Sequence, residues 1–242
     1  MSDRKPDAHD TESTRPRRAL RAVVSHVRPG SFPLLLAAAL LNYVLNGLAP
    51  ETAVGAALLG AGHVGVIGAG LYVLSERRIT ALVGVLLLGT HVALATHMWT
   101  PAQPMGRVLQ DSFASGYLLW LLAVVLREVF RPSTSERDAV VGALTGFLLI
   151  LSVFMRLHGL LEASFPGSYR ADDPPLSQRS DAQLLAVFQY FSTITLTTVG
   201  FGDILPVTPA ARLVTGLQAI IGQIYLAVVI ATLVSRVAAR RD

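Results

Sequence analysis

The chain contains no cysteine, which excludes disulfide bonds and thiolate metal sites. Charged residues are also scarce: Asp, Glu, Lys and Arg make up 15% of the 242 residues, whereas hydrophobic residues make up 52%. The mean hydropathy is +0.53. This composition is too apolar for a soluble domain and indicates a polytopic membrane protein.

Signs of catalysis are missing as well. The apolar stretches contain no paired carboxylates, no Ser/His dyad at a recognisable spacing and no H-x-x-x-H pair, so we do not expect an enzyme. The isoelectric point near 9.8 would suggest nucleic-acid binding in a soluble protein. Here the basic residues flank apolar stretches, where they determine topology, and we expect no nucleic-acid partner.

Six apolar stretches are each long enough to cross a membrane as a helix. They cover residues 32–49, 53–74, 79–99, 112–130, 139–158 and 209–237. A cleaved signal peptide is the alternative for the first stretch. Its leading segment is longer than a typical n-region and no clear small-x-small cleavage site follows, so we expect six transmembrane helices.

The second stretch contains Gly60 to Gly65, which fits the dinucleotide pattern G-x-G-x-x-G. That pattern requires a preceding strand and an aqueous crevice, whereas these glycines lie in the middle of a membrane span. We interpret the glycines of this stretch as small residues that let a neighbouring helix approach closely. They are Gly55, Gly60, Gly62, Gly65, Gly68 and Gly70.

The N-terminal tail, residues 1–30, is polar and basic, and its first half has no apolar pattern and should be disordered. From Arg17 onward apolar residues recur at helical spacing, which predicts a short amphipathic helix on an anionic cytoplasmic leaflet. A regulatory lipid switch is a more specific alternative. The basic residues of this helix are Arg17, Arg18, Arg21 and Arg28.

The distribution of Lys and Arg predicts the orientation. With a cytoplasmic N-terminus, the inside segments hold fifteen of these residues and the outside segments five, which favours both termini inside. The five outside residues are Arg107, Arg156, Arg170, Arg179 and Arg212.

Between the last two stretches, Thr195 to Asp203 reads T-L-T-T-V-G-F-G-D. It resembles the selectivity-filter signature of potassium channels, T-x-x-T-x-G-[YF]-G followed by Asp. A potassium ion that sheds water needs rings of backbone carbonyls at close range. Successive carbonyls can face one axis if the backbone alternates in hand, and glycine reaches the left-handed conformations without penalty. An ordinary turn over Gly200 to Asp203 is the alternative.

The resemblance implies a role for each residue of the motif. The carbonyls of Thr198, Val199, Gly200 and Phe201, with the Thr198 hydroxyl, would bind K⁺, and Gly202 would complete the filter. Asp203 would concentrate cations at the outer mouth. The residues implied to support the filter are Tyr190, Phe191, Thr195 and Thr197.

A short helix is predicted directly before the motif. Ser180 and Gln183 fit a capping box, and an apolar run follows over 184–197. Such a helix is about 20 Å long, too short to cross a membrane, and its partly negative C-terminal end would face a cation. Some family members carry a carboxylate where this chain has Ile194. Asp203 therefore needs another partner, either water or the aromatic end of this helix.

Residues 132–242 resemble a channel pore domain with an outer helix, an extracellular turret (160–180), a pore helix, the filter and an inner helix. Pro132 ends the preceding helix, and Ser133 with Glu136 fits a second capping box. Gly222 lies where the family often has a gating hinge, although close packing explains a glycine there equally well.

Residues 31–131 form a predicted four-helix peripheral domain of unassigned role. Its fourth helix matches the position of a voltage sensor, but 113–126 contain no charge, so we do not expect voltage gating by a charged helix. Polar residues within the spans indicate interhelical hydrogen bonds or, alternatively, proton sensing. They are Asn42, Asn46, His63, His91 and His97; His158, beside Arg156, is a candidate for an external pH effect.

We therefore expect an all-α membrane protein with six transmembrane helices, a re-entrant pore helix and a filter loop, assembled as a homotetramer. It would conduct K⁺ passively across the plasma membrane (the cell inner membrane), without any cofactor beyond the permeant ion. The sequence ends soon after the sixth stretch, so we expect no cytoplasmic regulatory domain. The alternatives are a less selective cation channel and a membrane sensor or adaptor with a vestigial pore.

Overall fold

The computed structural model describes residues 30–48, 52–73, 104–131, 134–171 and 174–238. Two predictions lie outside these residues. One is the basic amphipathic helix with Arg17, Arg18, Arg21 and Arg28, and the other is the third apolar stretch with His91 and His97.

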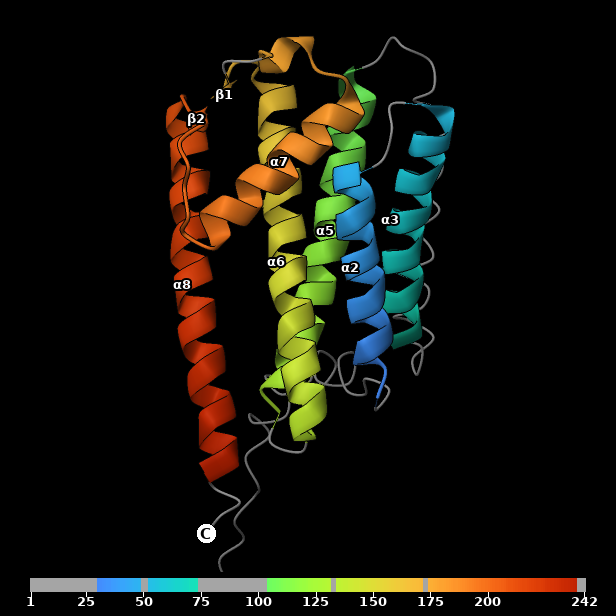
Figure 1. The fold of residues 1–242 in the computed structure, drawn as a ribbon, viewed down its shortest axis with the longest axis vertical. Helices are drawn as coiled ribbons and strands as arrows, with labels where there is room; N and C mark the ends of the chain where they lie inside the picture. Colours follow the sequence, from blue (N-terminus) through green and yellow to red (C-terminus); the bar gives the residue numbers. More distant parts are fainter. Residues whose placement is uncertain (1–29, 49–51, 74–103, 132–133, 172–173, 239–242) are drawn as a thin grey trace, which may run out of the picture.

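The described chain is a helical bundle with one small sheet (Figure 1). Its helices are α2 (Phe32–Leu48), α3 (Ala53–Val73), α5 (Pro104–Val129), α6 (Glu136–Ser164), α7 (Asp181–Leu196) and α8 (Pro209–Ala238), with a 3₁₀ turn η1 at Leu176–Gln178. Figure 1 shows α2, α3, α5, α6 and α8 running lengthwise, while α7 slopes across the bundle from its upper end.

Three described helices are long and apolar enough to cross a membrane. They are the Asp111–Val129 part of α5, all of α6, and α8 over Pro209–Thr232. Helices α2, α7 and the Ala57–Val73 part of α3 are apolar but shorter. The protein is thus a predominantly helical membrane protein.

The start of α6 corrects one prediction. Ser135, rather than Ser133, is the N-cap, and its hydroxyl accepts a hydrogen bond from the Asp138 N–H at 3.2 Å. Both serines have an acidic residue three positions later, so the pattern alone fits either one. Thr134 belongs to the preceding turn, because its hydroxyl donates to the Glu128 carbonyl at 2.7 Å. Consequently α6 begins at Glu136.

The start of α7 confirms the other capping box. The Ser180 N–H donates to the Gln183 side-chain oxygen at 2.7 Å, and the Gln183 N–H donates to the Ser180 hydroxyl at 3.3 Å. Local sequence therefore determines where this helix begins.

A two-stranded antiparallel sheet was not predicted. Strand β1 (Tyr169–Ala171) pairs with β2 (Ile204–Pro206), with Tyr169 opposite Pro206 and Ala171 opposite Ile204. Each strand has three residues, too few to show an alternating pattern. The sheet ties the loop after α6 to the segment that follows Asp203.

The glycines of α3 only partly behave as predicted. A side chain at Gly62 would meet Asn42 of α2, and one at Gly70 would meet Tyr117 and Leu121 of α5, so close approach is confirmed at these two positions. Side chains at Gly60, Gly65 and Gly68 would meet nothing in the described part of the chain.

Candidate functional site

The segment 197–203 links the end of α7 to β2. In Figure 1 α7 ends partway down the bundle beside α8, and the chain then turns back up along α8 toward β2. The candidate filter segment, which we define as 198–203, therefore lies at the depth of the apolar helix α8 with the C-terminal end of α7 at its base.

Hydrogen bonds to α7 set the direction of the first carbonyls of this segment. The N–H groups of Val199 and Gly200 both donate to the Ile194 carbonyl, at 2.8 and 3.1 Å, and that of Thr198 donates to the Thr195 carbonyl at 3.0 Å. In a planar trans peptide the carbonyl points opposite to the following N–H. The carbonyls of Thr197, Thr198 and Val199 therefore point away from α7.

The backbone is left-handed at every second residue of the segment. Thr198 has φ of +62°, Gly200 of +53° and Gly202 of +78°. The left-handed glycines confirm the prediction for Gly200 and Gly202. Thr198 is the one non-glycine residue with positive φ in the described residues, which is strained for a β-branched side chain, at about 1–3 kcal/mol.

Of the two predicted aromatic supports, Tyr190 contacts the segment. Its hydroxyl lies near enough to the Asp203 carboxylate to interact with it electrostatically, and the aromatic end of α7 as the partner of Asp203 stays a prediction. Phe191 instead lies in a buried aromatic group, with ring centroids 5.0 Å from His158 and 5.6 Å from Tyr169.

The threonines at the base of the segment have local partners. Thr195 is 9% exposed and contributes its carbonyl, while the Thr197 hydroxyl donates to the Thr193 carbonyl at 2.7 Å. The Thr198 hydroxyl accepts a hydrogen bond from the Gln223 side chain at 3.3 Å. Gln223 was not predicted, although an amide in the apolar run after Gly222 is a signal that could have found it.

Gly222 packs against the end of α7. A Cβ at this position would collide with the carbonyl oxygen of Leu196, which is the last residue of α7. The close-packing interpretation of Gly222 is therefore observed, and its role as a gating hinge stays a prediction.

His158 does not lie at an exposed outer surface, as an external pH effect would require. It is wholly buried among α7, α8 and β1, with hydrogen bonds to Tyr169 and Gln218. Arg156, two positions earlier on α6, instead contacts Asp111 and His63.

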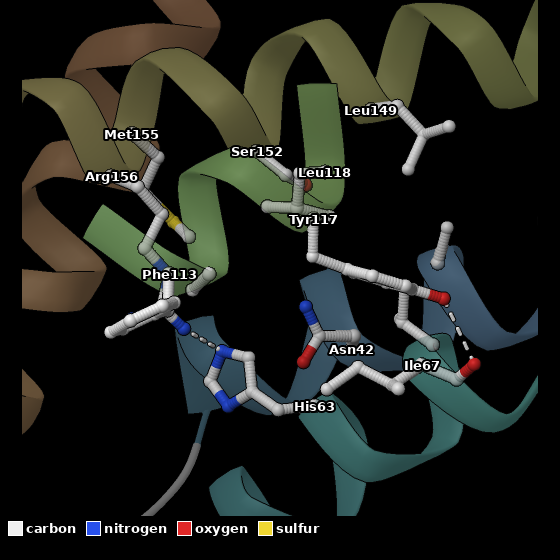
Figure 2. Close-up of a pocket in the computed structure, with 13 residues that line it drawn as sticks. Asn42, His63, Ile67, Phe113, Tyr117, Leu118, Leu149, Ser152, Met155 and Arg156 are labelled. Atoms are coloured by element: carbon white, nitrogen blue, oxygen red, sulfur yellow. Dashed lines mark hydrogen bonds between the residues drawn. The ribbon is translucent and has the colours of Figure 1, made fainter. Parts of the chain in front are cut away.

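A second polar site lies between the peripheral helices and α6 (Figure 2). Arg156 is buried, donates to the Asp111 carboxylate at 2.6 Å and bonds the His63 ring. The His63 and Arg156 side chains border a cavity of about 40 Å³, into which Asn42 also projects. Arg156, which was counted among the outside residues, lies within α6 and is charge-paired there, while the orientation of the chain stays a prediction.

Only part of the predicted interhelical bonding is found. His63 of α3 bonds Arg156 of α6, which confirms the prediction for His63. In the described part of the chain, the Asn42 side-chain oxygen and both side-chain amide atoms of Asn46 have no hydrogen-bond partner, although both residues are buried. The prediction that these amides bond a neighbouring helix is therefore not confirmed for those atoms.

The first predicted span reaches the candidate pore helix directly. The Gln189 side chain of α7 donates to the Tyr43 carbonyl of α2 at 2.9 Å, and the Tyr43 hydroxyl lies 3.2 Å from the Thr193 hydroxyl. The two halves of the chain are thus joined at α7 as well as at Arg156.

No cofactor site is apparent in the described ranges, where no group of three or more His, Asp or Glu side chains could hold a metal ion. Oxygen atoms of the backbone in the 198–203 segment are the remaining candidates for binding a cation, and carbonyl rings suit potassium.

Comparisons with known proteins agree with this assignment at a coarse level. The family model described as "Ion channel" matches residues 180–239, which cover α7, the candidate filter segment and α8. The "Two pore potassium channel c" of rice (Oryza sativa subsp. japonica) is 33% identical over 101 residues, 42% of this chain. The chain spans 20% of the length of that relative. No solved structure matches this chain. The two matches support an ion channel of the potassium-channel type in a membrane protein.

Proposed function

We propose that the chain is one subunit of a homotetrameric potassium-selective channel, with its pore on the fourfold axis. The observation that carries this proposal is the alternating backbone of the 198–203 segment, left-handed at Thr198, Gly200 and Gly202. An alternating backbone can turn successive carbonyls toward one axis, as potassium coordination requires.

The ion-binding groups are assigned on that basis. The carbonyls of Thr198, Val199, Gly200 and Phe201 and the hydroxyl of Thr198 coordinate K⁺, and Gly202 completes the filter. Asp203, near the Tyr190 hydroxyl, concentrates cations at the outer mouth. The C-terminal end of α7 adds a partial negative charge at the base of the segment.

Assembly into a tetramer is supported by what one chain leaves uncovered. Val199 is 54% exposed and Phe201 is 70% exposed. Non-helical backbone at membrane depth is tolerated only where protein or a water-filled cavity surrounds it, never against lipid. Three further copies of the chain around one axis meet that condition and close the ring of carbonyls.

Helix α8 supports the same arrangement. Within an apolar 18-residue stretch of α8, 11% of the residues are buried in one chain, compared with 61% in the corresponding stretch of α6. Large apolar side chains remain exposed along it, including Leu213, Ile220, Ile224 and Ile230. As the inner helix, α8 packs against neighbouring subunits and lines the inner part of the pore, with Gly222 as a candidate hinge.

The proposed location is the plasma membrane (the cell inner membrane), with multiple passes and both termini cytoplasmic. Basic residues still favour the inside once Arg156 is removed from the outside group, since four remain there against fifteen inside. In this orientation Asp203 and the start of α7 face outside. Gating by a charged helix is not part of the proposal, because α5 has no charge over 113–126.

A less selective cation channel and a sensor or adaptor with a vestigial pore are the alternatives. Substitution of the left-handed glycines tests a selective channel against these alternatives. A side chain at Gly200 or Gly202 would meet no neighbour within one chain, but it would strain the backbone at positive φ. Replacing either glycine by alanine should therefore alter the carbonyl positions without creating a clash within the subunit.

The experiment measures K⁺ and Na⁺ flux through the purified protein in liposomes. We expect the wild type to pass K⁺ selectively and Gly200→Ala and Gly202→Ala to lose that selectivity. Gly167→Ala is the matched control, since Gly167 has φ of +86° and open space around it but lies outside the segment. Equal selectivity in all four proteins would refute the assignment of the filter.

A further inference from the structure

A hydrogen-bond chain crosses the pore half of the molecule behind the candidate filter segment. It joins Tyr169 of β1, His158 of α6, Gln218 of α8 and the Ser192 carbonyl of α7. His158 and Gln218 are wholly buried, and Tyr169 is 3% exposed. The residues come from four different elements, and they meet one turn before the end of α7.

The direction of each hydrogen bond follows from its partners. The Gln218 side-chain nitrogen donates to the Ser192 carbonyl at 3.0 Å, which places the Gln218 side-chain oxygen 2.7 Å from His158 Nε2. The reverse amide orientation would set two oxygens against each other at Ser192. Because the Gln218 oxygen can only accept, His158 Nε2 must carry a proton.

The other ring nitrogen then accepts. His158 Nδ1 lies 2.6 Å from the Tyr169 hydroxyl, and in a neutral imidazole with Nε2 protonated it has a lone pair and no hydrogen. Burial raises the pKa of the Tyr169 hydroxyl, so this hydroxyl keeps its proton and donates it. Every polar atom along the chain is thereby satisfied with a neutral histidine.

Aromatic rings enclose the imidazole on its remaining sides. The rings of Phe191, Tyr169 and Phe154 have centroids 5.0, 5.3 and 6.2 Å away, and that of Phe188 lies 6.4 Å away in a stacked arrangement. Within the described residues, Tyr169 is the titratable side chain found against the ring. The Glu162 carboxylate accepts the Tyr169 backbone N–H at 3.0 Å. The ring is therefore locked in both position and tautomer.

From this geometry we propose that His158, held as the neutral Nε2–H tautomer, is a positioning residue for ion selection. It sets α7 against the outer helix α6, the inner helix α8 and the outer strand β1. The position of α7 affects the candidate filter segment, because the carbonyls of Ile194 and Thr195 accept hydrogen bonds from its first N–H groups. Both residues lie just beyond Ser192 on α7. This role rests on the proposed channel function, whereas the tautomer does not.

The tautomer is tested on the wild-type protein in lipid bilayers by ¹⁵N NMR of the imidazole nitrogens. His158→Gln identifies the His158 signals by their loss. We expect a protonated Nε2 and an unprotonated Nδ1 at neutral pH, and Tyr169→Phe should shift the Nδ1 signal. An Nδ1–H tautomer or a charged imidazolium would overturn the assignment, whether or not the protein conducts.

The positioning role is tested by K⁺/Na⁺ selectivity in liposomes. Gln218→Met keeps the side-chain size but removes both hydrogen bonds, and it should reduce selectivity by about three- to tenfold, the equilibrium effect of one buried hydrogen bond. Gln218→Glu should also lose selectivity, because a carboxylate cannot donate to the Ser192 carbonyl. His158→Gln retains a donor toward Gln218 and should restore most of the selectivity lost in His158→Leu.

The control is Ser192→Ala. Residue 192 enters the chain through its carbonyl, while its hydroxyl has no partner in the described residues, so this variant should select ions like the wild type. If Gln218→Met does not yield folded protein, Tyr169→Phe breaks the chain at its far end. Unchanged selectivity in a folded, conducting variant of Gln218 or Tyr169 would overturn the positioning role, whereas a wild type that passes no K⁺ would overturn the channel assignment.

Discussion

The two halves of the chain treat buried polar side chains differently. In the pore half, residues 132–242, His158 and Gln218 form a closed chain of hydrogen bonds and the Tyr225 hydroxyl donates to the Ala143 carbonyl at 2.5 Å. In the peripheral half, residues 31–131, buried side-chain atoms of Asn42, Asn46 and Ser115 have no partner within the described residues. The pore half also has such atoms, the Arg156 Nε and the Ser192 hydroxyl, so the difference between the halves is the connected chain of hydrogen bonds in the pore half.

This difference indicates what each half is suited to do. A fully satisfied buried network favours one arrangement of its elements, which a carbonyl ring for ions requires. The peripheral half contributes the unpartnered Asn42 side-chain oxygen to the lining of a cavity and Asp111 to a buried charge pair with Arg156 of the pore half. Intramembrane charges of this kind mark functional positions, so the peripheral half is the part where regulation should be sought.

The contact between the halves gives the largest predicted effect. Asp111→Ala leaves the buried Arg156 cation without its counter-ion, which should lower the free energy of unfolding by about 3–5 kcal/mol. Thermal unfolding of the purified protein in lipid measures this change. Asp111→Ala combined with Arg156→Met should recover much of the loss, and a double variant no more stable than Asp111→Ala would show that the pair does not couple the halves.

Within the pore half, substitution of Gly222 tests how closely α8 packs against the end of α7. Gly222→Ala places a methyl group against the Leu196 carbonyl and should reduce stability by about 1–3 kcal/mol through overpacking. Gly216→Ala on the same helix, where a Cβ meets nothing within 4 Å, should be neutral or slightly stabilising. Both are compared by unfolding temperature, and equal behaviour of the two variants would contradict the close packing of α8 on α7.

The peripheral half should respond in the opposite sense when a polar group is removed. Asn46 is 4% exposed and neither of its amide atoms has a partner within the described residues. Asn46→Leu should therefore stabilise the protein by about 1–2 kcal/mol by removing a desolvated amide. A clear loss of stability in the same unfolding assay would mean that this amide is satisfied in the assembled protein.

The smallest effect concerns the boundary between the halves. Ser135→Ala removes the N-cap of α6 and should cost about 1 kcal/mol. Ser133→Ala should have no comparable effect, because Ser135 occupies the N-cap position. The reverse result, measured by unfolding of the two variants side by side, would restore the original interpretation of Ser133 as the cap.

Sequence reasoning succeeded where the determining interactions are local. The Ser180–Gln183 box and the positive φ at Gly200 and Gly202 depend on residues a few positions apart, and both are found. It failed at the α6 cap, because two overlapping patterns, one starting at Ser133 and one at Ser135, satisfy the same rule.

Non-local contacts could not be predicted. His158 and Gln218 are sixty positions apart in the sequence, and Tyr43 and Gln189, which share a hydrogen bond, are 146 positions apart. Neither pair follows from a repeat or motif, because each depends on how helices pack. Arg156 illustrates the same limit, since the sequence places its charge near the end of an apolar stretch but does not identify Asp111 as its partner.

The most direct test of the central claim is the reversal potential of the wild-type protein in a planar bilayer with K⁺ on one side and Na⁺ on the other, while the voltage is stepped. The account predicts a reversal potential near the K⁺ equilibrium value and little dependence of opening on voltage. A reversal potential near zero would contradict potassium selectivity, and a folded, inserted protein that passes no current would contradict the channel itself.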